Sequence, residues 1–413
     1  MVLLAVFIAL VLLYSLLSRR LERTVITAPI FFTGAGLLIF LVPDWLSAYE
    51  VERKSFLVVA ELGLVMTLFT EAAHIDRKVL KGNRNLPVRL LSTGMLLTIL
   101  LGAVFASVVF PGLSPWEAGI LAAILAPTDA GLGQVIVSNL RVPMRIRQAL
   151  NVEAGLNDGL AVPFLMLFIA LALESDQRAG VVLWRFLQEQ LGYGALVGLV
   201  IGLGGGWLLG MARQRDWMAE RLQQIGLVTL PLLCMMLSEA TGASMFIAAF
   251  VAGLVVQIGS VDAGKHSAEF TEDWGQLFNF FVFFLFGLLV VRGGPHFALA
   301  PVLYAVLSLT VVRMVPVALA LLGTGLSRST VLFLGWFGPR GLASIVLGLV
   351  YLEHQAQLPG EETIRLAVMA TVLLSVFAHG LSALPGVNLY ARRLAALDSS
   401  APEHQEIKAK STD

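Results

Sequence analysis

Long apolar runs make up most of the chain and restrict its fold more than any other feature of the sequence. Each is about 20 residues long, the length with which a helix crosses the hydrocarbon core of a bilayer. A membrane barrel would need segments of about ten residues with alternating polarity. A mean hydropathy of +0.84 with 14% charged residues excludes a soluble or disordered chain. We therefore expect an all-α polytopic membrane protein with about 13 transmembrane helices, near residues 1–17, 24–42, 55–73, 88–110, 116–138, 147–173, 190–211, 222–240, 243–258, 275–291, 297–323, 328–352 and 363–389.

Basic residues test this number, because connections on the inner face of a membrane are rich in Lys and Arg. With the N-terminus outside and the C-terminus cytoplasmic, the inner connections and tail hold 20 basic residues and the outer connections hold six. The other two, Arg313 and Arg340, fall inside spans. This solution requires a tight turn at Thr241-Gly242 between two spans. The net charge is zero, so we expect no nucleic-acid partner.

Two predicted spans are interrupted by helix-breaking residues. The fifth contains Ala126-Pro127-Thr128-Asp129-Ala130-Gly131, and the twelfth contains Gly338-Pro339-Arg340-Gly341. A membrane helix can break only where protein or water satisfies the freed backbone groups, so both breaks indicate a binding site. They are seven spans apart, which gives the two spans opposite directions.

This relation predicts an inverted-topology repeat with two crossed discontinuous helices. Residues 1–189 form the first repeat, 190–221 a linker span, 222–390 the second repeat, and 391–413 a short cytoplasmic tail that its composition predicts to be disordered. Crossed breaks bring helix ends of opposite partial charge to mid-membrane, where Asp129 and Arg340 can compensate them. A purely structural alternative is that both prolines kink their helices, Asp129 caps one helix and Arg340 neutralises carbonyl ends.

The sixth span carries the most polar segment at depth, with Glu153, Asn157 and Asp158 in an otherwise apolar helix. A carboxylate that binds either a cation or a proton, but never both, makes the two ions compete and couples their transport. We expect Asp158 to be that carboxylate. Hard cations prefer oxygen ligands, so the Thr128 hydroxyl, a carboxylate oxygen and the carbonyls exposed at the breaks suit Na⁺ or Li⁺.

Glu153 needs a partner, because an unpaired charge inside a membrane is costly. Arg340 is the natural candidate, since both spans are expected at the site. This pairing keeps Glu153 ionised and leaves Asp158 as the titrating group. The sequence identifies no partner for Arg313.

Three motifs together resemble the cation/proton antiporters of the NhaP/Na⁺/H⁺-exchanger branch. They are Thr128-Asp129, Glu153-x-x-x-Asn157-Asp158-Gly159 and Pro339-Arg340-Gly341, and the resemblance extends over essentially all of the predicted spans. The chain departs from the family at Ala130, where Pro is frequent, and at Ala154, where Ser is frequent. The missing hydroxyl at Ala154 removes one possible cation ligand.

The resemblance implies an NhaA/NhaP-like fold with dimerisation and core domains, a homodimer, and electroneutral one-for-one exchange by elevator-like alternating access. It implies that a monovalent cation and a proton bind at Asp158 with help from Thr128 and Asp129, beside an Asn157 in place of a second Asp. It makes the Glu153–Arg340 pair structural and Glu71 a further ligand, although a water-facing Glu71 is the alternative. It also implies a transporter without a cofactor, not an enzyme, in the lipid bilayer of a bacterial inner membrane.

Two other functions stay open at the level of sequence. A K⁺/H⁺ antiporter would use the same residues. A Na⁺-coupled symporter of an organic anion on a related fold would need a second, roomier pocket beside the ion site. His379 in the last span is an equally good hydrogen-bonding partner for a neighbouring helix, so we leave it out of the predicted site.

Overall fold

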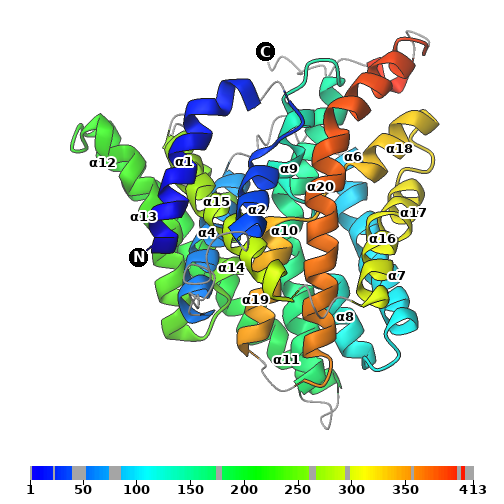
Figure 1. The fold of residues 1–413 in the computed structure, drawn as a ribbon. Helices are drawn as coiled ribbons and strands as arrows, with labels where there is room; N and C mark the ends of the chain where they lie inside the picture. The colour runs from blue at the N-terminus through cyan, green and yellow to red at the C-terminus, as the bar shows by residue number, and fades with distance from the viewer. Residues whose placement is uncertain are drawn as a thin grey trace. The chain divides into compact units, whose positions relative to one another are not determined.

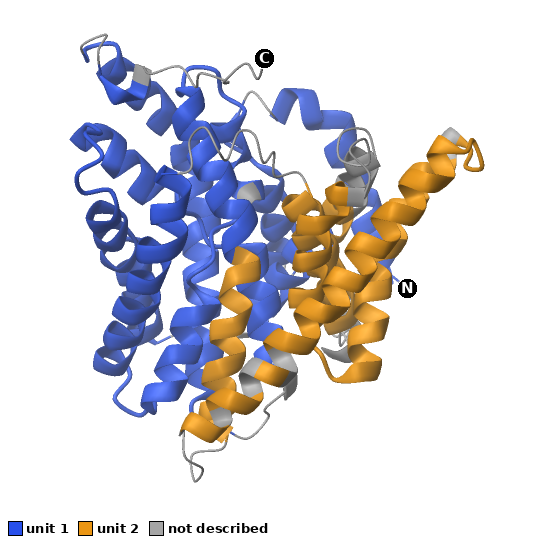
Figure 2. Ribbon diagram, turned by 180° about the vertical axis from the view of Figure 1, so that it is seen from behind, with its two compact units in different colours: residues 1–56, 77–157, 280–413 blue, residues 57–76, 158–279 orange. Residues whose placement is uncertain are grey.

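The structure is a computed structural model that describes residues 2–21, 24–39, 53–73, 85–173, 179–259, 267–293, 298–354, 358–397 and 401–404. All regular structure in these residues is helical (Figure 1). The chain forms two compact units, coloured separately in Figure 2. Unit 1 comprises residues 1–56, 77–157 and 280–413, and unit 2 comprises residues 57–76 and 158–279. Helix α10 passes from unit 1 into unit 2 between Asn157 and Asp158.

Unit 1 contains most of the helices, including both interrupted spans. Its helices are α1 (Val2–Leu21), α2 (Ala28–Leu38), α6 (Asn85–Arg89) continued by a π-helical turn (Leu90–Gly94), α7 (Met95–Val109), α8 (Pro115–Ile124), α9 (Ala130–Val137), the first half of α10 (Met144–Leu173), the last part of α15 (Ser267–Gly293), α16 (Leu299–Leu309), α17 (Val311–Ala320), α18 (Arg328–Trp336), α19 (Leu342–His354), α20 (Glu361–Leu394) and a short 3-10 helix (Pro402–His404).

Unit 2 is built around α12 and α14. Its helices are most of α4 (Arg53–Ala73), the second half of α10, α11 (Ala179–Phe186) continued by a π-helical segment (Leu187–Tyr193), α12 (Gly194–Gln214), α13 (Glu220–Thr241), α14 (Met245–Gly259) and the first part of α15. Glycines on one face of α12 allow its backbone to approach α14 closely. A Cβ atom at Gly202, for example, would lie 2.6 Å from the carbonyl oxygen of Ala252. The Gly-rich run of α12 therefore serves helix packing.

The helices follow the apolar runs of the sequence closely, and each predicted span contains at least one helix. Eight helices of the described residues are long and apolar enough to cross a membrane. Shorter apolar helices include α2, α14 and α19, and the total number of spans stays a prediction. The expected turn between two spans is present, because α13 ends at Thr241 and Gly242 has a left-handed φ of +69°. Gly tolerates this conformation without steric cost.

Both expected helix breaks are present in unit 1. The chain has no regular structure between α8 and α9 at residues 127–129, and it is non-helical between α18 and α19 at residues 337–341. A third break, which the sequence analysis did not predict, separates α16 from α17 at Thr310, with φ −107° and ψ −88°. Arg313 lies in the first turn of α17.

Of the predicted tail at residues 391–413, the structure describes residues 391–397 and 401–404, and the prediction of disorder for the other residues lies outside the described part of the chain. Helix α20 continues to Leu394, and residues 402–404 form a 3-10 turn that packs onto unit 1. The Glu403 side chain is buried and accepts hydrogen bonds from the Ser327 backbone N–H and the Thr330 hydroxyl, both at 2.7 Å. Composition alone predicts disorder because it cannot represent these tertiary contacts.

Candidate ion site at the helix breaks

The two broken segments contact each other through their backbones. The Asp129 N–H donates to the carbonyl oxygen of Pro339 at 2.7 Å. This bond joins the break after α8 to the break after α18, although the two residues are far apart in the sequence. Backbone groups freed by one break therefore find partners in the other, as burial requires.

Asp129 caps two helices with one carboxylate. Its Oδ1 accepts from the Leu132 N–H at 2.8 Å, at the start of α9, and its Oδ2 accepts from the Leu342 N–H at 2.6 Å, at the start of α19. The negative charge thus lies where the positive ends of two helix dipoles meet. Gly341 makes this possible, since a Cβ there would overlap the Asp129 carboxylate. The structural alternative predicted that Asp129 caps one helix, whereas in the structure it caps both α9 and α19.

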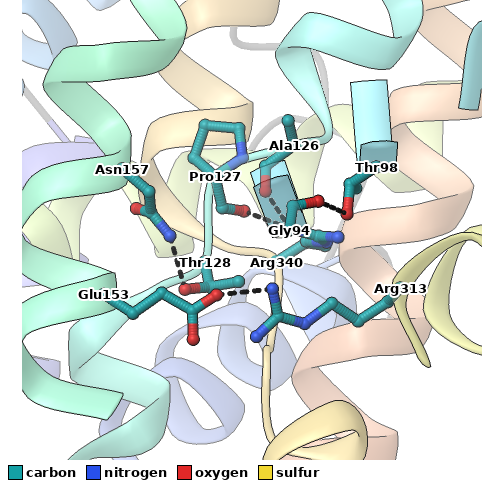
Figure 3. Close-up of polar contacts among 9 residues, drawn as sticks. All are labelled: Gly94, Thr98, Ala126, Pro127, Thr128, Glu153, Asn157, Arg313 and Arg340. Atoms are coloured by element: carbon teal, nitrogen blue, oxygen red, sulfur yellow. Dashed lines mark hydrogen bonds and ion pairs between the residues drawn. The ribbon is translucent and has the colours of Figure 1, made fainter. Parts of the chain in front are cut away.

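Arg340 compensates the C-terminal end of α8. Its guanidinium group donates to the carbonyl oxygens of Ala126 and Pro127, the second at 2.8 Å (Figure 3). The backbone N–H of Arg340 donates to the Ser375 hydroxyl at 2.6 Å. These carbonyls follow the last turn of α8, where the helix dipole is negative. The side chain is fully buried, and the carbonyl oxygens at this break accept hydrogen bonds from its guanidinium group.

The ion pair at Glu153 differs from the expected one. Glu153 Oε1 accepts from Arg313 Nη1 at 2.6 Å, with both side chains buried, so the predicted pairing with Arg340 is wrong in its cation (Figure 3). The physical reason is that Arg340 is held by carbonyls of the first break. Arg313 also lies against the second break, because a Cβ at Gly338 would overlap its guanidinium group. Arg313, for which the sequence identified no partner, is therefore the partner of Glu153.

The helix that bears Asp158 is connected to the first break by a hydrogen bond. Asn157 Nδ2 donates to the Thr128 hydroxyl at 2.6 Å, and both side chains are buried (Figure 3). Asp158 is the next residue of α10, in unit 2, and is itself 5% exposed. The Thr128 hydroxyl accepts this bond and keeps its own hydrogen and a second lone pair for another partner.

A small cavity within unit 1 adjoins Thr128, while Asn157 and Asp158 are not among the residues that line it. It is lined by Thr128, Asp129 and Asn151 among others, with Phe337 and Pro339 from the second break. Its volume is about 10 Å³, which is about the space of one water molecule. The cavity can therefore hold a water or a small ion beside the Thr128 hydroxyl, and it is far too small for an organic anion.

Two other residues complete the placement of the predicted groups. Glu71 lies on α4 in unit 2 and is half-buried. His379 lies in α20, where its Nδ1 is 3.1 Å from the Ser375 hydroxyl and its ring is 5.0 Å from the Trp336 ring. It thus neighbours the serine that binds the Arg340 backbone. Ser375 was missed in the sequence, since a serine in an apolar helix gives no sign of its partner.

A model of the transmembrane region of sodium/hydrogen exchangers matches residues 3–388 of the chain. The chain belongs to the sodium/hydrogen exchanger family. The resemblance that the motifs indicated is therefore confirmed. This sodium/hydrogen exchanger family protein is a multi-pass membrane protein of a transporter family, not an enzyme.

Similar members of the family are named as antiporters of different cations, Na⁺ or K⁺. A Na⁺/H⁺ antiporter 2 of Zygosaccharomyces rouxii is 25% identical over 328 residues, covering 74% of this chain and 40% of the relative. A K⁺/H⁺ antiporter NhaP2 of Shewanella sp. strain MR-4 is 28% identical over 282 residues, covering 65% of this chain and 46% of the relative. The chain thus spans less than half the length of these relatives.

The fold is similar to that of the sodium proton antiporter MjNhaP1 from Methanocaldococcus jannaschii. The TM-score is 0.69 at 21% identity, over 92% of this chain and 99% of that chain. The expectation of an NhaP-like fold is therefore confirmed for the overall architecture.

Proposed function

We propose that this chain exchanges Na⁺, or Li⁺, for H⁺ across a membrane, with Asp158 as the carboxylate that binds either ion. The observation that carries the proposal is the hydrogen bond from Asn157 to Thr128. It ties the residue before Asp158 to the broken segment whose hydroxyl can ligate a cation. In this proposal Thr128 contributes a ligand oxygen, and Asn157 holds that hydroxyl in position.

The charges around the breaks support Asp158 as the exchanging group. Asp129 serves two helix N-termini, and Glu153 is paired with Arg313. Together with Arg340, these side chains comprise two carboxylates and two guanidinium groups, so their charges balance. A transported cation needs negative charge beyond this set, and Asp158 supplies it. Asp129 has carboxylate lone pairs left over from its two backbone bonds, so a contribution to the cation is compatible with its capping role.

The size of the cavity distinguishes between the candidate substrates. A volume of about 10 Å³ beside Thr128 and Asp129 suits a small cation, and an organic anion does not fit in the same cavity. A K⁺/H⁺ antiporter is the second candidate, and the name of the Shewanella relative favours it. Cation selectivity therefore has to be measured. Glu71, which is half-buried on α4, stays a proposed further ligand.

The larger architecture is proposed on the basis of the two breaks. The first half-helix of each interrupted span, α8 and α18, begins at a serine N-cap, Ser114 or Ser327, and contains ten or nine residues. This likeness supports thirteen spans with an inverted repeat. A homodimer, an elevator-like cycle, an outside N-terminus and a bacterial inner membrane belong to the same proposal.

Proton flux in proteoliposomes tests the function. A pH dye inside the vesicles reports proton movement when Na⁺, Li⁺ or K⁺ is added in turn. Wild-type protein is expected to move protons on addition of Na⁺ and Li⁺, and Asp158→Asn is expected to show only the signal of empty liposomes. A response to K⁺ alone would replace the first candidate with the second.

The matched control is Asp216→Asn. Asp216 is exposed and has a left-handed φ of 56°, a conformation that Asn also adopts readily. This variant removes one carboxylate without straining the backbone, and its exchange is expected to equal that of wild type. Cation-driven proton flux by a monodisperse Asp158→Asn protein would overturn the proposal.

A further inference from the structure

A groove of about 340 Å³ lies between α18 and α20 of unit 1. Its walls include Leu332 and Trp336 from α18, Phe337 from the break, and Leu389 from α20. Leu332 is 53% exposed and Leu389 is 55% exposed, although both are large apolar side chains. In a multi-pass membrane protein, such a surface faces the hydrocarbon of lipids.

The groove runs from one end of these helices into the protein. Ser329 and Arg393 lie at its outer end, and Phe337 and Gly386 lie deeper. Ser329 and Phe337 are eight positions apart along α18 and its end, a rise of about 12 Å. A Cβ at Gly386 would lie 2.5 Å from the Phe337 ring, so this glycine lets the ring rest against the backbone of α20. The groove therefore has an aromatic inner wall and a charged mouth.

The charge at the mouth is positive. Arg393 lines the groove and is exposed. Arg328 is also exposed, and it directly precedes Ser329, which lines the groove. Neither guanidinium group forms an ion pair with a carboxylate of the residues that the structure describes. Glu403 is close in the fold, but its Oε1 is bonded to Ser327 and Thr330. An apolar slot with a free cationic mouth is complementary to an acyl chain that carries an anionic headgroup.

We propose that this groove binds one acyl chain of an anionic phospholipid from the bilayer leaflet that borders the C-terminal end of α20. The phosphate lies at Arg393, and the chain passes Leu332 and Leu389 toward Phe337. The polar groups of the wall do not oppose this, because Trp336 Nε1 is already bonded to the Ser382 hydroxyl at 3.0 Å.

Phe337 connects the groove to the candidate ion site. The same ring lines both the groove and the small cavity that contains Thr128 and Asp129. A chain packed against one side of Phe337 restricts its movement away from the cavity on the other side. Lipid occupancy therefore influences the ion cavity, a consequence that rests on the proposed exchange function, whereas lipid binding itself does not.

Binding is tested on delipidated protein in detergent by native mass spectrometry, with phosphatidylglycerol and phosphatidylcholine as probes. Wild-type protein is expected to retain one phosphatidylglycerol more tightly than phosphatidylcholine. Arg393→Gln is expected to weaken phosphatidylglycerol binding about fivefold and leave phosphatidylcholine unchanged, the loss for one guanidinium group near an anionic headgroup. Arg392→Gln is the matched control, because Arg392 is also exposed but does not line the groove.

Filling the groove tests the position of the acyl chain. Leu389→Trp is expected to remove the tight phosphatidylglycerol site, while Leu381→Trp, at a 48% exposed position of α20 outside the groove, is expected to keep it. Equal losses for Arg393→Gln and Arg392→Gln would overturn the headgroup assignment, and retention of the site by Leu389→Trp would overturn the groove. The exchange rate of Leu389→Trp in proteoliposomes then tests separately whether filling the groove affects the ion cavity through Phe337.

Discussion

At the scale of residues, the buried pair of Glu153 and Arg313 has the largest expected energetic effect. Both side chains are buried, and the Oε1–Nη1 distance is 2.6 Å. Arg313→Met leaves the carboxylate of Glu153 without its cation, which costs about 3–5 kcal/mol for a buried pair. We expect a strong loss of thermal stability in detergent, measured by size-exclusion chromatography after heating. The double variant Glu153→Gln/Arg313→Met is expected to recover much of it.

An exposed pair provides the control for this prediction. Glu362 and Arg365 form an ion pair at 2.8 Å with side chains that are 61% and 38% exposed. Arg365→Met is expected to change the free energy of unfolding by about 0–1 kcal/mol. If Arg313→Met is as stable as Arg365→Met, Glu153 has another partner in the membrane.

The Thr128 hydroxyl carries the prediction on cation affinity. Thr128→Val removes a ligand oxygen and the acceptor for Asn157, whereas Thr128→Ser keeps both. We expect the KM for Na⁺ to rise roughly tenfold in the valine variant, about the effect of one hydrogen-bonded ligand. The serine variant is expected to stay close to wild type. The measurement is the Na⁺ dependence of proton flux in proteoliposomes, and equal KM values for valine and serine would remove Thr128 from the site.

Sequence reasoning placed the residues of the site better than it paired them. Asp129 and Arg340 compensate helix ends as expected, because Pro and Gly clusters in apolar runs mark where helices break. The hydrogen bond between Asn157 and Thr128 was not predicted. The partner of Glu153 could not be predicted. Arg313 and Arg340 are both buried. Arg340 is bound by the carbonyl oxygens freed at the first break, so Arg313 forms the ion pair with Glu153, and the sequence alone does not show these positions.

At the scale of elements, the N-terminus of α18 shows what the sequence could not reveal. Helix α8 has a complete capping box, in which Ser114 and Glu117 bond each other's backbone N–H. In α18 the third residue is Thr330, and Glu403 of the C-terminal segment supplies the carboxylate for the Ser327 N–H. Apolar periodicity predicted the helix bounds, but a cap supplied from 76 residues away depends on the tertiary fold.

This cap predicts a local effect of Glu403→Gln. The amide has no negative charge for the helix N-terminus, so the variant should lose about 1 kcal/mol of local stability. Amide hydrogen exchange, read by mass spectrometry, is expected to speed up in the first turn of α18 and not in the first turn of α8. Glu362→Gln, at an exposed position, is the control. Unchanged exchange in α18 would show that the C-terminal segment does not cap it in solution.

The pH dependence of the cap follows from the pKa of Glu403. Burial raises this pKa, but hydrogen bonds from Thr330 and Ser327 outweigh burial, so the pKa is lowered overall. A carboxylate with a lowered pKa stabilises the fold fully above its unfolded pKa of about 4.3 and loses that contribution as the pH falls toward the lower value. Protection of α18 is therefore expected to be constant at neutral pH and to decline only in acid, and the Glu403→Gln variant should lack this decline.

At the scale of the whole molecule, the number of carboxylates predicts the charge moved in each cycle. Asn157 occupies the position before Asp158 and is neutral, and its amide is bonded to Thr128. One carboxylate that takes one Na⁺ or one H⁺ in turn carries the same charge in both directions. The proposed exchange is therefore electroneutral, and it should generate no membrane potential.

Proteoliposomes with a clamped potential test this stoichiometry. For a protein that the selectivity assay shows not to exchange K⁺, equal K⁺ with valinomycin holds the potential at zero, and a K⁺ gradient with valinomycin sets it to either sign while the Na⁺ gradient stays fixed. We expect the same initial rate and the same final pH difference in all three conditions, because no net charge crosses with each cycle. A proton ionophore added to empty liposomes is the control that the imposed potential is real, since it must then drive proton flux. If the final pH difference of protein-containing vesicles follows the imposed potential, more than one proton accompanies each cation, and a second titrating group besides Asp158 takes part in transport.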